Sequence, residues 1–293
     1  MKKKKRSLCF DDYPNLKLGF STQNFLKCMP VNLENLEEII TFAAVEGYSF
    51  IELRDPEAIL SLDECKKLAE IARTNEIEIL YEINANILAP GFLSVFKKGL
   101  ENTTVFPGKG ILRTLISNTE FAADPNKKGW TKEELEQIVS IANTCGELAG
   151  KRSIVFIVEN GNEAFFGQSP LYFGFADFFN RTNKSIGLQF DTSNPFQNIS
   201  REKSNPDQVE KYLTTITDRW FTTHLKSGKD GVFQPVLNDN PLDLGKVLSL
   251  MNTSNVPYVA FELASVSDKQ ECFENHGRSI NYLYEKGLIK ICV

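Results

Sequence analysis

Short apolar runs rich in β-branched and aromatic residues recur along the chain, and longer segments of helical periodicity separate them. Eight of these runs have the length and composition of buried strands. They span residues 17–22, 50–55, 78–84, 111–117, 154–161, 186–194, 220–227 and 258–264. In the intervening segments apolar residues return every three or four positions, which predicts a helix with one buried face after each strand.

The helical segments carry start and stop signals of their own. Ser61 precedes Glu64 by three residues, and Thr131 precedes Glu134 by the same interval, a spacing typical of capping boxes. Gly47 follows the first periodic segment and predicts its end. The expected helices cover residues 33–47, 61–75, 92–102, 131–150, 169–183, 205–218, 241–252 and 267–287.

Strand and helix alternating eight times predict an α/β fold, a single (β/α)8 TIM barrel. The alternative is an open, doubly wound sheet, which calls for a glycine-rich phosphate loop after its first strand; neither GxGxxG nor GxxxxGK[ST] occurs. No Gly/Ser-rich or Pro-rich linker divides the 293 residues. We therefore expect a basic, flexible tail over residues 1–15 and one barrel domain over residues 16–293.

Composition narrows the range of partners. The formal charge is −5, so we expect no nucleic-acid partner, because phosphate binding needs a basic face. No segment approaches the ~18 consecutive apolar residues of a membrane span. No apolar segment follows the basic run 2–6, which predicts a solvated terminus rather than a secretion signal. The alternative is a patch that binds nucleic acid or anionic lipid.

Cysteine and histidine set further limits. The six cysteines are scattered without a CxxC motif, which argues against a zinc ribbon or a disulfide framework and predicts reduced thiols in a cytoplasmic protein. There are only two histidines, so sites built from several imidazole ligands are excluded.

Four consecutive late strands end in a side chain that can bind a metal. These residues are Glu159, Asp191, His224 and Glu262, and one βα unit separates each from the next. Because side chains alternate along a strand and the carboxyl ends of barrel strands share one rim, all four are expected to point into the barrel at the same end. Three carboxylates and one imidazole suit one divalent ion, either Mn²⁺, Mg²⁺, Co²⁺ or Zn²⁺.

Each of these residues taken singly has a plainer interpretation. A lone glutamate at a strand end is more often a surface or ion-paired residue, and a lone histidine is more often part of the core. The repetition at one position on four successive strands favours the metal site.

Further inward-facing polar residues are expected near this rim. We predict that Arg54, Lys226, Asn194, Glu52 and Glu82 bind substrate through hydroxyl, carboxylate or phosphate groups. The structural alternatives are an ion pair between Arg54 and Glu82 or between Glu52 and Lys226. Asn194 precedes a proline and is equally suited to forming a turn.

Several short motifs, in this order, resemble the xylose isomerase-like TIM-barrel family, of the sugar phosphate isomerase/epimerase type. They are LGFST (18–22), FIELR (50–54), ENG (159–161), FDTSN (190–194), HLKS (224–227) and FELA (261–264). The resemblance covers about residues 16–290. It implies that Glu159, Asp191, His224 and Glu262 hold one divalent ion, and that Glu159 and Glu262 form the acid/base pair.

The chemistry of such a site agrees with this division of roles. Removing a proton next to a carbonyl produces an enediolate, whose oxygen a metal ion stabilises, while two carboxylates remove and return the proton. The resulting hypothesis is a metal-dependent isomerase or epimerase of a small-molecule sugar, sugar phosphate or ketose. The alternatives are a metal-dependent dehydratase of a keto-polyol and a non-catalytic sugar- or metal-binding barrel.

The chain departs from ketose 3-epimerases at two positions. Those enzymes carry a histidine where this chain has Asn194, and a substrate-binding arginine where it has residues 228–231. The related apurinic endonucleases need several histidines and are excluded. Since members of such families often pair, a homodimer is possible.

Overall fold

The structure is a computed structural model that describes residues 7–10, 12–116, 127–161, 163–167, 169–197, 204–229 and 232–292. Eight parallel strands close a barrel in the order β11-β2-β3-β4-β5-β6-β7-β8, which confirms the predicted (β/α)8 fold. The strands are β2 (Lys17–Ser21), β3 (Phe50–Arg54), β4 (Glu78–Glu82), β5 (Ile111–Leu115), β6 (Val155–Glu159), β7 (Ile186–Asp191), β8 (Trp220–Leu225) and β11 (Tyr258–Phe261). Each lies within one of the predicted runs.

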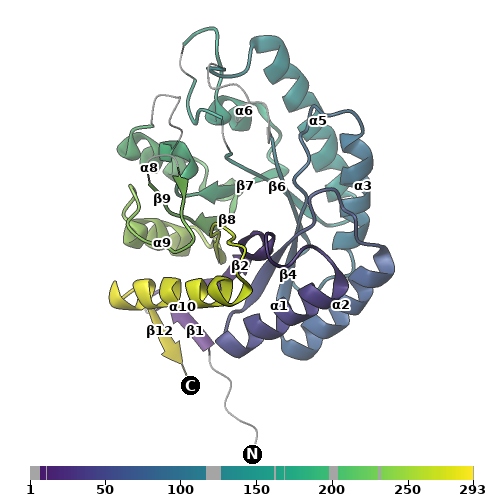
Figure 1. Cartoon of the computed structure of the whole chain (residues 1–293). Coiled ribbons are helices and arrows are strands. Elements are labelled where there is room, and N and C mark those ends of the chain that lie inside the picture. Colours follow the sequence, from purple (N-terminus) through teal and green to yellow (C-terminus); the bar gives the residue numbers. More distant parts are fainter. Residues whose placement is uncertain are drawn as a thin grey trace, which may run out of the picture.

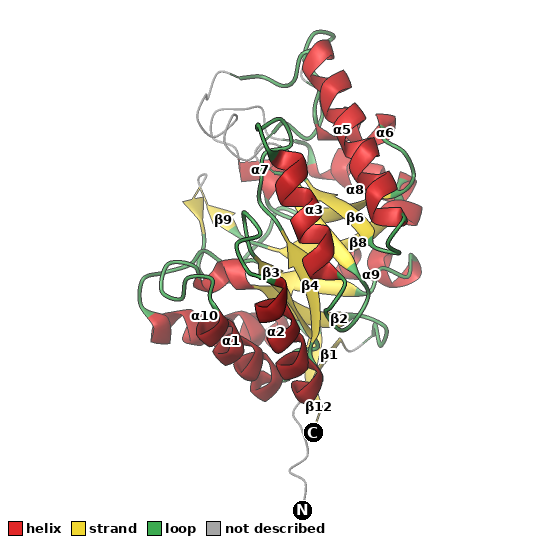
Figure 2. Ribbon diagram, turned by 90° about the vertical axis from the view of Figure 1, so that its right-hand side faces the viewer, coloured by secondary structure: helices red, strands yellow, loops and turns green. Residues whose placement is uncertain are grey.

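Helices surround the barrel, as Figures 1 and 2 show. They are η1 (Thr22–Phe25), α1 (Leu33–Glu46), α2 (Leu62–Asn75), α3 (Phe92–Thr103), α5 (Lys132–Gly150), α6 (Phe175–Arg181), α7 (Asn194–Gln197), α8 (Pro206–Thr215), η2 (Thr217–Arg219), α9 (Leu244–Thr253) and α10 (Lys269–Glu285). Both predicted capping boxes form, at the first residues of α2 and α5. The expected helix over 169–183 is shorter, because Ser169 bridges to Tyr172 and Phe173 to Trp130 before α6 begins.

A small antiparallel sheet joins the two ends of the chain. β1 (Ser7–Phe10) pairs with β12 (Ile289–Cys292), and Figure 1 shows the two strands side by side near both termini. The expected flexible tail over residues 1–15 is therefore wrong for residues 7–10, which are held because Leu8 and Phe10 are buried. Residues 1–6 lie outside the described part of the chain.

The interior of the barrel is layered. At the amino-terminal ends of the strands it is filled by a compact apolar cluster: Phe50, Leu80, Ile111, Ile157, Tyr258 and Ala260. The residue two positions after most of these is charged, as in Leu80 and Glu82 or Ile157 and Glu159. Since side chains alternate along a strand, an apolar layer lies beneath a charged layer at the carboxyl ends.

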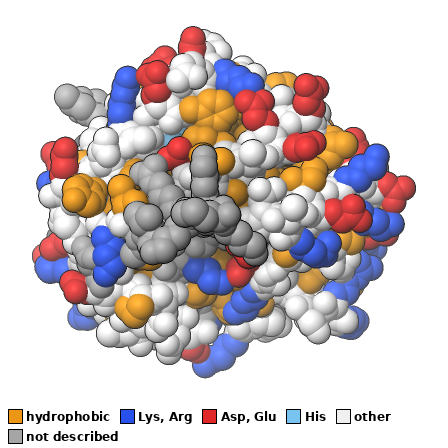
Figure 3. Space-filling view, turned by 90° about the horizontal axis from the view of Figure 1, so that it is seen from below, with side chains coloured by type: hydrophobic (Ala, Val, Ile, Leu, Met, Phe, Trp, Pro, Cys, Tyr) orange, Lys and Arg blue, Asp and Glu red, His pale blue; other side chains and the backbone are white. Residues whose placement is uncertain are grey.

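The molecular surface carries side chains of both charge signs. On the face in Figure 3, acidic and basic side chains lie interspersed among the described residues. None of the described helices combines the length and the apolar character needed to cross a bilayer. Among the cysteines whose side chains are described, Cys9, Cys28, Cys65, Cys145 and Cys272 are free thiols.

Candidate metal centre

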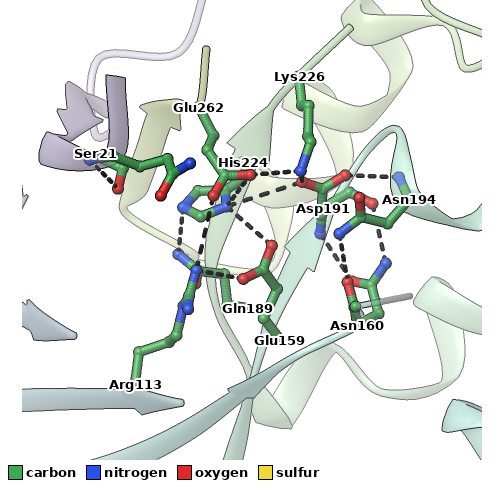
Figure 4. Close-up of polar contacts among 12 residues, drawn as sticks. Ser21, Arg113, Glu159, Asn160, Gln189, Asp191, Asn194, His224, Lys226 and Glu262 are labelled. Atoms are coloured by element: carbon green, nitrogen blue, oxygen red, sulfur yellow. Dashed lines mark hydrogen bonds and ion pairs between the residues drawn. The ribbon is translucent and has the colours of Figure 1, made fainter. Parts of the chain in front are cut away.

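The four predicted metal ligands lie together in the charged layer. Glu159 and Asp191 are the last residues of β6 and β7, His224 lies in β8, and Glu262 directly follows β11. One oxygen or nitrogen atom from each lies within 4.8 Å of the others, and all four side chains are buried. Figure 4 shows them converging from neighbouring strands. The spacing of the sequence thus predicted this convergence correctly.

The two carboxylate oxygens of Asp191 have different surroundings. Its Oδ1 accepts hydrogen bonds from the backbone N–H groups of Ser193 (2.8 Å) and Asn194 (2.7 Å). Its Oδ2 is buried and accepts no hydrogen bond within the described part of the chain, and Lys226 Nζ lies 3.4 Å away. Burial raises the pKa of Asp191 to about 7, against the opposing effect of Lys226. An oxygen held in this way suits coordination to a cation.

Asn194 braces the turn after β7. Its side-chain Nδ2 donates to the carbonyl oxygen of Asn160 at 2.8 Å, while Asn160 Oδ1 accepts from the backbone N–H of Asp191 at 2.8 Å. Figure 4 shows Asp191 between Lys226 and these two asparagines. This placement matches the turn-forming alternative, and the predicted contact of Asn194 with substrate stays a prediction.

The two ring nitrogens of His224 face different groups. Nδ1 points at the other three candidate ligands, lying 3.1 Å from Glu159 Oε1, 3.6 Å from Glu262 Oε2 and 3.9 Å from Asp191 Oδ2. Nε2 points away from them, to Glu52 Oε2 at 2.5 Å. Metal-binding histidines commonly have this arrangement, in which the second nitrogen donates to a carboxylate.

Charge governs the protonation of this cluster. Burial lowers the pKa of His224, but Glu52, Glu159 and Glu262 outweigh it and raise the pKa well above its usual value. Burial raises the pKa of Glu262, but Lys226, followed by His224, holds that pKa well below the usual value. The pKa of Glu159 is also lowered, by Arg113 and His224 against the effect of burial. Both glutamates are therefore ionised at neutral pH.

Two predicted cations contact the carboxylates of the centre. Arg54 Nε lies 3.0 Å from Glu82 Oε1, and its Nη1 lies 3.1 Å from Glu262 Oε1. Lys226 Nζ lies 2.7 Å from Glu262 Oε2. The suggested Arg54–Glu82 ion pair forms, whereas the suggested Glu52–Lys226 pair does not, because Glu52 faces His224 instead.

Arg113 is a central residue that the strand pattern did not single out. Its Nη1 lies 2.8 Å from Glu82 Oε1, its Nη2 forms an ion pair with Glu159 Oε2, and its Nε donates to Gln189 Oε1 at 2.6 Å. The signal was available in the parity of the strand, since Arg113 follows inward-facing Ile111 by two residues. The apolar character of its neighbours concealed it.

The buried cluster carries an excess of negative charge. Its described carboxylates are Glu52, Glu82, Glu159, Asp191 and Glu262, and its described cations are Arg54, Arg113 and Lys226. With all five carboxylates ionised, the net charge is −1 when His224 is protonated, as its raised pKa indicates, and −2 when its Nδ1 gives up that proton to bind an ion. Because uncompensated buried charge is costly, and because hard oxygens with one imidazole suit a divalent ion, this donor set fits one such ion.

Fold and centre together define a (β/α)8 barrel with a buried carboxylate–imidazole cluster at the carboxyl ends of its strands. No protein-family model matches the sequence, and no curated protein sequence matches it. Among solved structures the barrel is similar to D-psicose 3-epimerase from Clostridium cellulolyticum H10 with D-tagatose. The TM-score is 0.67 at 12% identity, over 93% of this chain and 99% of that one.

Two further structures resemble the chain over similar lengths. D-allulose 3-epimerase from Methylomonas sp. in complex with D-allulose aligns with a TM-score of 0.66 at 12% identity, over 95% of this chain and 99% of that one. An IolI protein with a bound zinc atom aligns with a TM-score of 0.63 at 18% identity, over 92% and 96%. At these identities the likeness establishes the fold, which agrees with the fold that the predicted resemblance implies.

Proposed function

We propose that this protein is a divalent-metal-dependent isomerase or epimerase of a small carbonyl sugar. The convergence of Glu159, Asp191, His224 and Glu262 within 4.8 Å carries the proposal. The similar barrels support it, because they include epimerases crystallised with D-tagatose and D-allulose and an IolI protein with zinc.

The same four residues would hold the ion, which would be Mn²⁺, Mg²⁺, Co²⁺ or Zn²⁺. A bound divalent ion supplies positive charge that stabilises the enediolate oxygen formed when a proton leaves the carbon next to a carbonyl. Glu159 and Glu262 move that proton. Both are ionised at neutral pH and ready to accept it on a carboxylate oxygen.

Lys226 and Glu82 lie in different surroundings, which indicates different roles. The side chain of Lys226 is 12% exposed, and its Nζ lies 4.2 Å from the centre of the Phe233 ring. Phe233 belongs to β10 (Val232–Phe233), a short strand that pairs with β9 (Gly228–Lys229). The partial exposure of Lys226 supports its predicted contact with a sugar hydroxyl. Glu82 is enclosed by Arg54 and Arg113 and serves to hold those cations in place.

Solvent deuterium exchange tests this proposal. The protein is incubated in D₂O with Mn²⁺ and a panel of ketoses and aldoses, and the position of the label is read by NMR. Label at C3 indicates an epimerase, and label at C1 or C2 indicates an aldose–ketose isomerase. The absence of label from every sugar would contradict both activities and favour a binding protein.

A further inference from the structure

A chain of hydrogen bonds runs through the barrel beneath the candidate metal centre. Arg113 Nε donates to Gln189 Oε1 at 2.6 Å, and Gln189 Nε2 donates to Glu52 Oε1 at 2.6 Å. Glu52 Oε2 lies 2.5 Å from His224 Nε2. The four residues belong to β5, β7, β3 and β8, and all are buried. The chain therefore links four barrel strands to one imidazole.

The direction of each hydrogen bond follows from the chemistry of its groups. A guanidinium only donates, so the Gln189 oxygen must face Arg113 and the Gln189 amide hydrogens must face Glu52. A carboxylate oxygen accepts, so Glu52 Oε2 accepts a hydrogen bond from the Nε2–H group of His224. Gln189 Nε2 lies 3.0 Å from His224 Nε2, and both N–H groups are directed at Glu52. A neutral His224 is thereby left with its lone pair on Nδ1.

That lone pair points at oxygen atoms. Nδ1 lies 3.1 Å from Glu159 Oε1 and 3.6 Å from Glu262 Oε2, and both carboxylates are acceptors when ionised. Because the neighbouring carboxylates raise the pKa of His224 well above its usual value, Nδ1 of the protonated ring donates to Glu159. A divalent ion would take the place of that proton and bind the lone pair. The hydrogen-bond chain thus selects the tautomer that a metal site requires.

We propose that Glu52, Gln189 and Arg113 are positioning residues that fix the tautomer and the ring orientation of His224, so that Nδ1 is its metal-binding atom. This inference rests on the proposed metal-dependent function. It gives Glu52 a different role from the substrate contact suggested by its sequence position, because both of its carboxylate oxygens are already bonded and its exposed fraction is 3%. Partners of this kind typically change metal affinity 10- to 100-fold.

The most direct test uses the scarcity of histidine. His276 is the only other histidine, and it is buried in α10 between the Tyr48 hydroxyl and the Asn24 amide, away from the centre. Protein labelled with ¹⁵N-histidine is loaded with ¹¹³Cd²⁺, and cadmium–nitrogen coupling is read by NMR. We expect coupling to Nδ1 of His224, a proton on its Nε2, and no coupling at His276.

The alternative results separate the inference from the function on which it rests. Coupling at Nε2 of His224 would overturn the positioning role while leaving the metal centre in place. The absence of both cadmium coupling and Mn²⁺ binding in the unaltered protein would overturn the metal centre and the inference together.

Substitution of Glu52 provides a second, independent test. Glu52 accepts a hydrogen bond from Gln189 on one oxygen and from His224 on the other. In Glu52→Gln one of these two oxygens becomes an NH₂ group, which faces a donor, and Arg113 prevents Gln189 from turning its own oxygen toward it. Mn²⁺ binding, measured from the electron paramagnetic resonance signal of the free ion, should weaken about 10- to 100-fold. Unchanged affinity in this variant would overturn the inference.

Glu78→Gln is the matched control for that substitution. Glu78 is a barrel carboxylate at the opposite end of the strands, bonded to Lys17 at 2.6 Å and to the Tyr258 hydroxyl at 2.8 Å. It loses comparable contacts without touching the centre, so its Mn²⁺ affinity should equal that of the unaltered protein. A comparable loss of affinity in this control would show that the effect of Glu52 is a general loss of stability and would contradict the positioning role. If Glu52→Gln fails to fold, the cadmium experiment on the unaltered protein decides the question.

Discussion

Lys226 Nζ lies 2.7 Å from Glu262 Oε2, and this ion pair is formed at the mouth of a barrel whose interior carries a net negative charge. Removing this cation leaves Glu262 with two guanidinium groups, Arg54 at 3.1 Å and Arg113 at 4.0 Å. In the proposed mechanism Lys226 keeps one proton-transferring carboxylate ionised and offers its ammonium group to substrate.

Lys226→Met should therefore lower kcat/KM by about 10²- to 10³-fold, the usual effect of removing one charged group that stabilises a transition state. Steady-state kinetics with the labelled sugar substrate measure the change. Lys269→Met is the control, because Lys269 pairs with Glu38 on the surface and such pairs contribute little. Equal activity of the Lys226 and Lys269 variants would refute a role for Lys226.

Glu262→Gln and Glu159→Gln should each reduce turnover by about 10²- to 10⁴-fold, because an amide cannot accept the proton. Glutamine has nearly the same shape as glutamate, so circular dichroism should show a folded barrel in both variants. Glu78→Gln, at the far end of the strands, should retain full turnover. Substantial activity in Glu262→Gln would remove that residue from the acid/base pair.

Arg113→Met should lower the free energy of unfolding by about 3–5 kcal/mol, since it leaves buried Glu82 and Glu159 without their shared cation. Urea titration followed by tryptophan fluorescence measures the loss. A change below about 1 kcal/mol would show that the two carboxylates are stabilised by other means.

His276 should make the protein sensitive to acid. Burial lowers its pKa to about 3 from the usual 6.5, so the unfolded chain binds this proton more readily than the folded one. Stability contributed by the neutral ring is thus complete above pH 6.5 and is lost as the pH falls toward 3.

Between pH 7 and pH 5 this residue alone should remove about 2 kcal/mol of unfolding free energy. Urea titrations of the unaltered protein and of His276→Gln, at both pH values, isolate the effect. The variant should lose about 2 kcal/mol less than the unaltered protein over this interval. An identical loss in both would contradict the assignment.

Much of this architecture was accessible from the sequence, because it depends on local rules. Alternation along strands and the shared rim of a barrel were enough to place Glu159, Asp191, His224 and Glu262 together. Gln189 and Arg113 escaped notice because each interrupts an apolar run and becomes informative only when its partners on other strands are known.

The parts that were not predicted depend on contacts between distant segments. β1 and β12 pair across the whole length of the chain, and no local pattern announces such a pairing. Likewise, Glu52 pairs with His224 of β8 rather than with Lys226, which lies two residues further along the same segment. This choice depends on how far along the barrel axis each side chain lies, which no local pattern shows. The homodimer and the cytoplasmic location stay predictions.

The central claim is that a metal held by Glu159, Asp191, His224 and Glu262 enables proton transfer on a sugar. The most direct measurement is deuterium incorporation by protein stripped with a chelator, before and after one equivalent of Mn²⁺ is restored, alongside the His224→Ala variant. We predict label next to the sugar carbonyl only in the restored protein, with no bound ion and no label in the variant. Incorporation by the stripped protein, or by His224→Ala, would contradict the account.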